Sequence, residues 1–382
     1  MQAMTRARGR LLAAATVLAF TAALGGCASM NIETPLPSFT GFGGAGAQST
    51  ARIEQVFIAS TRKGDSGKAS TDGVHYSLAT IGLPPGHHSG VVEKPMWGSP
   101  DPKSHFVVKG TRPLDAEEFH NELASHLSGR VGVDRDVLVY VHGFNTSFEE
   151  ARFTTAQVAA DAHFGGVPIL FTWASASQLL GYESDKDAAT ASRDALQELF
   201  TDLSQTPGVG KIHVLAHSMG AWLAMEALRQ EAIAGKRDLD GHLGDVMLAS
   251  PDLDIDVFAS QMAKLRPAHV TVLASNKDRA LSLSSAIADS RQRVGAIDPN
   301  NPVDRRKIES LGAQVYDLSS YGDGFISHNT YASTPEVLAS IGAAITAPRA
   351  DDSGKMSIID ASAYPDPAAP PPAPAPTPTP PQ

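Results

Sequence analysis

The sequence predicts an α/β fold with a mostly parallel central sheet and helices on both faces of that sheet. Between Ala51 and Pro348, short runs rich in β-branched residues alternate with longer segments whose apolar residues recur at helical spacing. Such alternation is typical of parallel strands joined by covering helices. The chain has 382 residues, of which 42% are hydrophobic, and α/β domains of about 200 to 250 residues are common. We therefore expect one large domain over residues 51–348.

The amino-terminal end has the pattern of an export signal. Three arginines precede the apolar run Leu11–Leu24, which is too short to span a bilayer. The run leads into Leu24-Gly25-Gly26-Cys27, which resembles the lipobox of bacterial lipoproteins, and in that class of proteins the cysteine is acylated and becomes the mature N-terminus. We expect residues 1–26 to be a signal peptide and Cys27 to be lipidated.

The segments on either side of the domain have compositions typical of flexible chain. Residues 27–50 are rich in Gly, Ser, Thr and Pro, which suits a tether. Residues 349–382 become dominated by Pro and Ala, so we expect a disordered tail, with contact between this tail and the cell wall as the open alternative. Because Ala28 follows Cys27, and lipoproteins without Asp at that position often reach the outer membrane, we expect a lipid-anchored envelope protein that faces the periplasm.

The charge and the cysteine count exclude several kinds of site. The net charge is −10 and the basic side chains are not clustered, which argues against a nucleic-acid binder, since phosphate contacts need clustered Lys and Arg. A single cysteine excludes an intramolecular disulfide and a cysteine-cluster metal site. His87 and His88 are adjacent and have no carboxylate at ligand spacing, so we expect surface or packing roles for them. We expect no metal and no organic cofactor.

The individual strands and helices can be placed in chain order. The predicted strands are Glu54–Ser60, Tyr76–Leu83, Asp136–Val141, Pro168–Trp173, Lys211–Ala216, Asp245–Ala249, His269–Ser275 and Gln314–Leu318. The predicted helices are Asp115–Ser128, Phe148–Phe164, a long helix from near Asp185, Met219–Ala234 and Pro335–Ile345. Strand Asp136–Val141 is nearly continuous Val, Leu and Tyr, as expected for a strand buried on both faces.

The string Ala216-His217-Ser218-Met219-Gly220 lies where a predicted strand meets a predicted helix. It has the small-x-Ser-x-small pattern in which a strand turns sharply into a helix and lifts a serine hydroxyl above the sheet. The flanking residues must be small because the two backbones nearly touch there, and Ala216 keeps that smallness although Gly is commoner. Ser218 is therefore the candidate nucleophile.

Acyl transfer by a serine also needs a base, an acid that orients the base, and donors for the oxyanion. The expected donors are the backbone amide of Met219, at the start of a helix, and that of Phe144 in the loop after an earlier strand, with Asn145 as a second candidate. His142 opens the same loop. Chain order in this arrangement is serine, acid, histidine, so we expect a structural role for His142.

The acid is expected after a late strand, where Asn276-Lys277-Asp278 stands, and Asp278 is the candidate. The rival acids lie one strand earlier and are Asp252, Asp254 and Asp256. A calcium loop is excluded for these three because Val257 replaces the turn glycine and Ala263 the closing Glu, so we expect them to be capping or loop residues. The base is expected last, and His328 follows the final strand.

Several strings of the sequence form a distinctive set, namely Ile81–Pro84, Gly90–Pro95, His142–Asn145, Thr172–Ser175, Leu179–Tyr182, Ala216–Gly220 and Asn276–Leu281. Together they resemble a bacterial α/β-hydrolase family of esterase/lipase-like proteins whose function is largely uncharacterised. The resemblance covers about Gln55 to Ile341, and it implies an α/β-hydrolase fold with Ser218, Asp278 and His328 as the triad. The family usually carries Pro where Ala174 stands, which affects the entrance loop rather than the chemistry.

The expected activity is cleavage of small-molecule or lipid carboxylic esters at the cell envelope. In this interpretation His328 deprotonates Ser218, Asp278 orients the imidazole, and backbone amides hold the oxyanion. The segment Ala176–Tyr182 forms either an apolar lid over the acyl chain or a loop packed on the domain. Two other functions stay open, namely a non-catalytic lipoprotein that uses this fold as a binding module, and a serine amidase or acyltransferase.

Overall fold

The computed structural model describes residues 51–347, except residue 71 and the stretches 179–180, 266–267, 279, 282–290 and 322–326. The predicted signal peptide, the lipidation site Cys27, the tether and the tail lie outside the described residues. No helix in the described part of the chain has both the length and the apolar character that crossing a membrane requires.

A single sheet runs through the described part of the chain, with its strands in the order β3-β2-β1-β5-β4-β6-β7-β8-β9. The strands are β1 (Arg52–Ser60), β2 (His75–Leu83), β3 (Val107–Leu114), β4 (Val137–Val141), β5 (Val167–Thr172), β6 (Ile212–His217), β7 (Leu243–Ala249), β8 (His269–Ala274) and β9 (Ala313–Asp317). Neighbours from β1 to β9 pair in parallel, whereas β2 is antiparallel to both β1 and β3. The predicted fold class, with a mostly parallel sheet, is confirmed.

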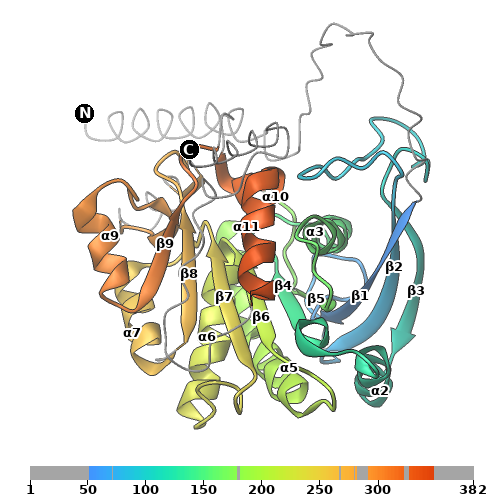
Figure 1. Cartoon of the computed structure of the whole chain (residues 1–382), viewed down its shortest axis with the longest axis horizontal. Helices are drawn as coiled ribbons and strands as arrows, with labels where there is room; N and C mark the ends of the chain where they lie inside the picture. The colour runs from blue at the N-terminus through green and yellow to red at the C-terminus, as the bar shows by residue number, and fades with distance from the viewer. Residues whose placement is uncertain are drawn as a thin grey trace, which may run out of the picture.

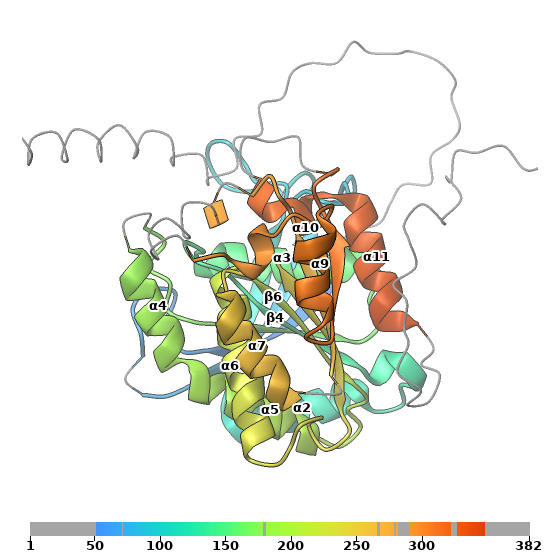
Figure 2. The same ribbon diagram turned by 90° about the vertical axis from the view of Figure 1, so that its left-hand side faces the viewer.

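Helices cover both faces of this sheet, as Figures 1 and 2 show. They are α2 (Ala116–Leu127), α3 (Phe148–Asp161), α4 (Tyr182–Ala191), α5 (Arg193–Gln205), α6 (Met219–Ile233), α7 (Ile255–Leu265), α9 (Pro302–Glu309), α10 (Thr330–Ser333) and α11 (Pro335–Thr346). The buried side chains of α2, α5, α6 and α7 belong to one apolar cluster, while those of α3, α10 and α11 belong to another. Each cluster therefore lies on one face of the sheet.

Strand β4 shows how one sequence serves both clusters. Val137, Val139 and Val141 pack with the α5–α6 side, and Leu138 and Tyr140 pack with the α3–α11 side. Successive side chains of a strand point to opposite faces, so a continuous apolar run is what a strand covered on both faces needs. All five side chains are buried.

One predicted helix is divided, and one strand was missed. The long helix expected from near Asp185 is two helices, α4 and α5, which meet at Ser192. Strand β3 was not predicted because it is an edge strand with mostly exposed side chains, and its Gly110 and Pro113 are poor strand formers. Helix α2 was placed well, because Asp115 and Glu118 form a reciprocal capping box at its start.

Parallel pairing brings the carboxyl ends of several strands to one edge of the sheet. Val141 of β4 pairs with Ala216 of β6, and His217 pairs with Ala249 of β7. The loops that follow β4, β6, β7, β8 and β9 therefore open at the same edge, which is where open α/β sheets place their sites.

Candidate active site

Ser218 occupies a sharp turn between β6 and α6. Its backbone has φ 53° and ψ −120°, a strained conformation for a residue with a side chain, which costs on the order of 1–3 kcal/mol and persists only where the surroundings enforce it. Those surroundings are backbone hydrogen bonds: the Ser218 amide donates to the Ala249 carbonyl at 2.9 Å, and the Ser218 carbonyl accepts from the Asp252 amide at 3.1 Å. This geometry matches the expected strand-turn-helix that presents a nucleophile.

Glycines allow the segments around Ser218 to approach closely. A Cβ on Gly220 would collide with the carbonyl oxygens of His142 and Val141, and a Cβ on Gly143 would lie 3.0 Å from the Ser218 Cβ. The start of α6 therefore rests against the end of β4, and the loop expected to supply an oxyanion donor lies against the nucleophile. The smallness that the sequence suggested for packing β6 against α6 is required mainly between α6 and β4.

His328 and Asp278 form a hydrogen-bonded pair, with 2.8 Å between Nδ1 of His328 and Oδ2 of Asp278. The Asp278 carboxylate also accepts a hydrogen bond from the Leu281 amide. Burial acts to raise the pKa of Asp278, but the attraction and hydrogen bond of His328 outweigh it, so this pKa is lowered. Likewise, burial acts to lower the pKa of His328, but Asp278 outweighs it and the pKa is raised.

His217 links this pair to Ser218. Its Nε2 donates to the His328 carbonyl at 3.2 Å, and its ring lies between His328 and Tyr331, with centroid separations of 4.6 and 4.8 Å. Burial, together with the charge of His328, lowers the pKa of His217 to about 3, so the ring is neutral and serves as a hydrogen-bond donor and a packing surface. Because His217 directly precedes Ser218, this contact holds the His328 segment beside the elbow.

His142 anchors the loop after β4 to the protein interior. The His142 ring is fully buried and stacks on Trp173 with a centroid separation of 5.0 Å, and its backbone carbonyl accepts from the Trp173 indole at 2.9 Å. Burial and the nearby Arg62 charge lower the pKa of His142 far below its usual value. These surroundings give His142 the structural role expected from the sequence. Phe144 and Asn145 form the half-buried turn of the loop, with Asn145 at φ 56°.

The rival acids have other partners. Asp252 forms an ion pair with Arg293 at 3.1 Å and accepts from the Tyr182 hydroxyl at 2.7 Å. Asp254 accepts from two backbone amides at the start of α7, as expected of a capping residue, and pairs with Arg291. Asp278, not one of these three carboxylates, is the acid that His328 contacts.

His87 differs from the surface or packing role expected for it. Its Nδ1 lies 2.9 Å from Glu93 and its Nε2 lies 3.0 Å from Asp161, so two carboxylates reach this histidine, one of them from distant sequence. They bind opposite nitrogens of the ring and thus cannot share one ion with it. Among the described residues, no group of three or more His, Cys, Asp or Glu side chains has the arrangement of a metal site.

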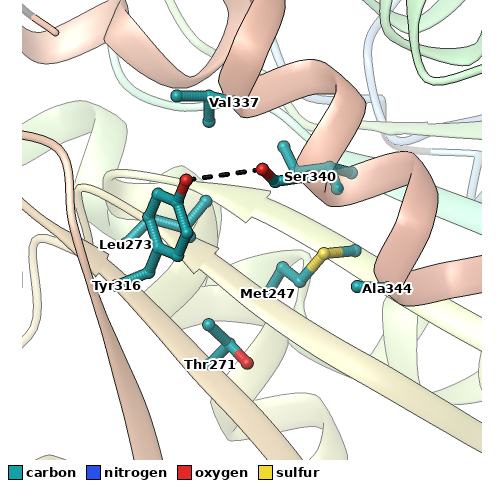
Figure 3. Close-up of a pocket in the computed structure, with 8 residues that line it drawn as sticks. Met247, Thr271, Leu273, Tyr316, Val337, Ser340 and Ala344 are labelled. Atoms are coloured by element: carbon teal, nitrogen blue, oxygen red, sulfur yellow. Dashed lines mark hydrogen bonds between the residues drawn. The ribbon is translucent and has the colours of Figure 1, made fainter. Parts of the chain in front are cut away.

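A small apolar pocket lies away from these groups, between α11 and the sheet (Figure 3). Met247, Leu273 and Tyr316 line its floor, and α11 contributes Val337 and Ser340, whose hydroxyl lies 3.4 Å from that of Tyr316. None of the candidate catalytic side chains lines this pocket, so it is a packing gap on the α3–α11 face rather than part of the site.

Sequence reasoning missed Arg62 and His217, which contact the site through tertiary structure. His217 carried a weak signal, as the residue next to Ser218 in the elbow pattern. Arg62 stands in an unremarkable loop sequence, so no local pattern distinguishes it.

Comparison with solved structures found several weakly similar α/β proteins. A lipase-esterase related protein from Clostridium acetobutylicum is 8% identical, with 55% of this chain and 93% of that chain covered and a TM-score of 0.33. A predicted CIB-like hydrolase from Thermoplasma acidophilum is 15% identical (56% and 86% covered, TM-score 0.31), and a fungal esterase from Rhizomucor miehei is 13% identical (78% and 83% covered, TM-score 0.35). At this level of similarity these structures carry no argument about the reaction.

Comparison with curated proteins found no match. A family model described as "Alpha/beta hydrolase of unknown function (DUF900)" matches residues 115–346, which is more than half of the chain. The match begins at the N-cap of α2 and ends at the last residue of α11, so it includes Ser218, Asp278 and His328. The chain therefore belongs to this family of α/β hydrolases.

Proposed function

We propose that the protein is a serine hydrolase that cleaves carboxylic esters, with Ser218 as nucleophile, His328 as base and Asp278 as the acid that orients the base. Because Nδ1 of His328 is engaged by Asp278, Nε2 is the nitrogen that takes the Ser218 proton. Oγ of Ser218 then bonds to the ester carbon, and the carbonyl oxygen becomes an oxyanion held by the Phe144 and Met219 amides, with Asn145 as a further candidate donor.

The second half of the reaction uses the same groups. Protonated His328 gives its proton to the leaving alcohol as the ester C–O bond breaks, which leaves an acyl group on Ser218. His328 then takes a proton from water, the hydroxide attacks the acyl carbon, and the carboxylic acid departs as Ser218 regains its proton.

The observation that carries this proposal is the hydrogen-bonded His328–Asp278 pair packed on His217, the residue next to the strained Ser218. A module that only binds a partner has no need of a strained serine with a paired histidine beside it. Membership in an α/β-hydrolase family adds independent support. The proposed apolar lid over the acyl chain stays a prediction, because Leu179 and Leu180 lie outside the described residues.

The test uses the purified protein with p-nitrophenyl esters of increasing chain length and a fluorophosphonate probe. We expect turnover and probe labelling in the wild type, and loss of both in Ser218→Ala, because the probe reacts only with an activated serine. The matched control is Ser260→Ala, since Ser260 lies exposed on α7 and bonds only to its own helix.

Labelling without ester turnover would favour the amidase or acyltransferase alternative, and the same probe-reactive enzyme would then be assayed with amides and acyl acceptors. A folded wild-type protein that shows neither labelling nor turnover would contradict the enzymatic proposal. Equal labelling of wild type and Ser218→Ala would contradict the choice of nucleophile.

We also propose that this chemistry takes place at the bacterial cell envelope, with the domain tethered to the outer membrane through a lipid on Cys27. The support is the sequence alone, namely the apolar run before the lipobox-like string and the flexible composition of residues 27–50. A lipid anchor would bring the site close to lipid esters as well as to small soluble ones.

A further inference from the structure

Arg62 is an arginine whose side chain is buried behind the loop that follows β4. It is 1% exposed and stands two residues after β1. Nε donates to the Thr172 hydroxyl at 2.7 Å, Nη1 donates to the Ser175 carbonyl at 3.1 Å, and Nη2 donates to the Thr146 carbonyl at 2.8 Å. One side chain thus ties the end of β1 to the ends of the β4 loop and of β5.

This guanidinium carries its charge inside the protein. Burial lowers the pKa of Arg62 to about 10, with attraction from Asp185 and Asp65 acting in the opposite direction, so the group is charged at neutral pH. The Asp185 carboxylate accepts from the Ser175 hydroxyl at 2.6 Å and from the Ala176 amide at 2.8 Å. A buried charge costs several kcal/mol unless its partners are well placed, and an apolar side chain would fill the space without that cost.

The fourth contact of Arg62 helps to set the protonation of His142. Nε2 of His142 lies 3.0 Å from the Thr172 hydroxyl, 3.2 Å from Nη2 of Arg62 and 3.2 Å from the Trp173 amide. The Arg62 and Trp173 groups can only donate, and the hydroxyl can donate as well, so Nε2 is the acceptor and the ring proton is on Nδ1. Nδ1 lies 2.9 Å from the Gly143 carbonyl and therefore donates to it.

The orientation of one peptide group follows from this bond. The carbonyl of Gly143 and the amide of Phe144 belong to the same peptide unit, and in a trans peptide the C=O and N–H point in opposite directions. Because the carbonyl is directed at His142, behind the loop, the Phe144 amide is directed away from His142. A Cβ on Gly143 would lie 3.0 Å from the Ser218 Cβ, so this peptide unit is close to Ser218.

We propose that Arg62 is a positioning residue for the oxyanion hole, which acts through His142 to orient and polarise the Gly143–Phe144 peptide. This inference rests on the proposed ester hydrolysis. Arg62 keeps Nε2 of His142 as an acceptor, Nδ1 then holds the Gly143 carbonyl, and the Phe144 amide is left as a fixed donor for the oxyanion. Hydrogen bonds in such a chain polarise one another, so the buried positive charge strengthens a donor that it does not touch.

The kinetic test compares full-length wild type with Arg62→Gln and Arg62→Lys. We expect Arg62→Gln to lower kcat by roughly 10- to 100-fold with little change in KM, because the lost interaction acts on the oxyanion and not on the bound ester. Arg62→Lys keeps the charge but not the fork of donors, so its kcat should lie between those of wild type and Arg62→Gln.

A trifluoromethyl ketone inhibitor reports on the oxyanion hole directly. Oγ of Ser218 adds to the ketone carbon, its proton passes to His328, and the carbonyl oxygen becomes the oxyanion. Across the three proteins, the affinity for this inhibitor should fall in proportion to kcat/KM. The matched control is His213→Gln, because His213 is also fully buried between charged groups, Asp136 and Asp245, but near the opposite end of β6; it should lose stability and keep kcat.

Nitrogen NMR of ¹⁵N-histidine-labelled protein tests the structural step without turnover. The wild type should show His142 protonated on Nδ1, and Arg62→Gln should shift protonation toward Nε2. The proposal is overturned if wild-type His142 carries its proton on Nε2, or if the Arg62 variants lose only stability while inhibitor affinity stays unchanged. An inactive, unlabelled wild type would instead contradict the ester hydrolase, and the His142 signals would still decide whether Arg62 sets this tautomer.

Discussion

Two opposing effects act on the pKa of His328: burial lowers it by disfavouring the charged imidazole, and the Asp278 carboxylate raises it by favouring that form. The carboxylate prevails, so the folded-state pKa of His328 is above its ordinary value of 6.5, and this pairing contributes stability below pH 6.5 that is lost as pH rises through the folded pKa. The folded-state pKa of Asp278 is below 3.8, so its contribution is present above that pH and is lost as pH falls through the folded pKa.

The same shift predicts the pH dependence of the reaction. Only neutral His328 can accept the Ser218 proton, so kcat/KM for a p-nitrophenyl ester should rise with pH through a pKa above 6.5. In Asp278→Asn the attraction of Asp278 is gone, while burial and the weaker attraction of Asp252 remain. The acid limb should therefore move to lower pH, and kcat should fall on the order of 10³- to 10⁴-fold. Complete pH–rate profiles of both proteins measure the two effects.

The control for that profile is Asp256→Asn, because Asp256 is an exposed carboxylate that pairs with Arg291 on the surface. It should leave both the rate and the acid limb as they are in the wild type. An acid limb that stays in place in Asp278→Asn would show that another group sets the pKa of His328.

Among the elements, the closest approach in the site is between the end of β4 and the start of α6. The carbonyl oxygens of Val141 and His142 occupy the space where a Gly220 side chain would be. Parallel pairing of β4 with β6 sets this distance, and the turn at Ser218 has to fit within it. The geometry at Ser218 thus depends on a contact between segments about 80 residues apart in the chain, as their numbers show.

A single methyl group tests this contact. Gly220→Ala should lower the free energy of unfolding by about 1–3 kcal/mol, because overpacking against backbone forces the helix to shift, and it should lower kcat because the shift moves the Met219 amide. Urea denaturation of both proteins measures the first effect. Gly110→Ala is the matched control, since a Cβ at Gly110 meets open space and no positive φ constrains that residue; equal losses in both variants would contradict the packing argument.

Local patterns predicted those elements whose causes are local. The elbow at Ser218, the continuous apolar strand β4 and the capped helix α2 each follow from a few neighbouring residues. Strand β3 was missed because an exposed edge strand needs little apolar alternation, and Arg62 was missed because its partners lie on other strands. The order of serine, acid and histidine along the chain led to Asp278 and His328. The contact of His217 with His328 could not be predicted, because it forms only when the chain is folded.

At the scale of the whole molecule, the described domain begins at β1 and ends with α11, and residues 1–50 and 348–382 lie outside it. Helix α11 contributes Val337, Leu338 and Ile341 to the cluster on the α3 side, so the domain is closed by its last helix. Figure 1 shows α11 across the face of the sheet, next to α3. We expect the segments beyond these limits to decide where the domain is held rather than how it reacts.

The anchoring residue provides the test of location. In the bacterial host, the full-length protein should be found in the membrane fraction and incorporate labelled palmitate, and Cys27→Ala should lose both because the acylated residue is gone. Ester turnover per molecule should be the same, since the domain is unchanged. Ser29→Ala is the control, and a wild type found only in the soluble fraction would contradict the lipoprotein proposal.

The hydroxyls of Tyr140 and Tyr331 lie 2.7 Å apart and connect β4 to α10. This contact bears on when the site can form as the chain is synthesised. When the ribosome has made the chain through β7 and Asp252, the backbone hydrogen bonds that hold the Ser218 turn can form, but the chain still lacks its proposed base. His328 reaches its place only as α10 docks on β4, with Gln157 of α3 bonding the Ala332 carbonyl at 2.9 Å. On the proposed mechanism, competence for hydrolysis is therefore acquired last, after the whole domain has been synthesised, and we expect an incomplete chain to carry an inert Ser218.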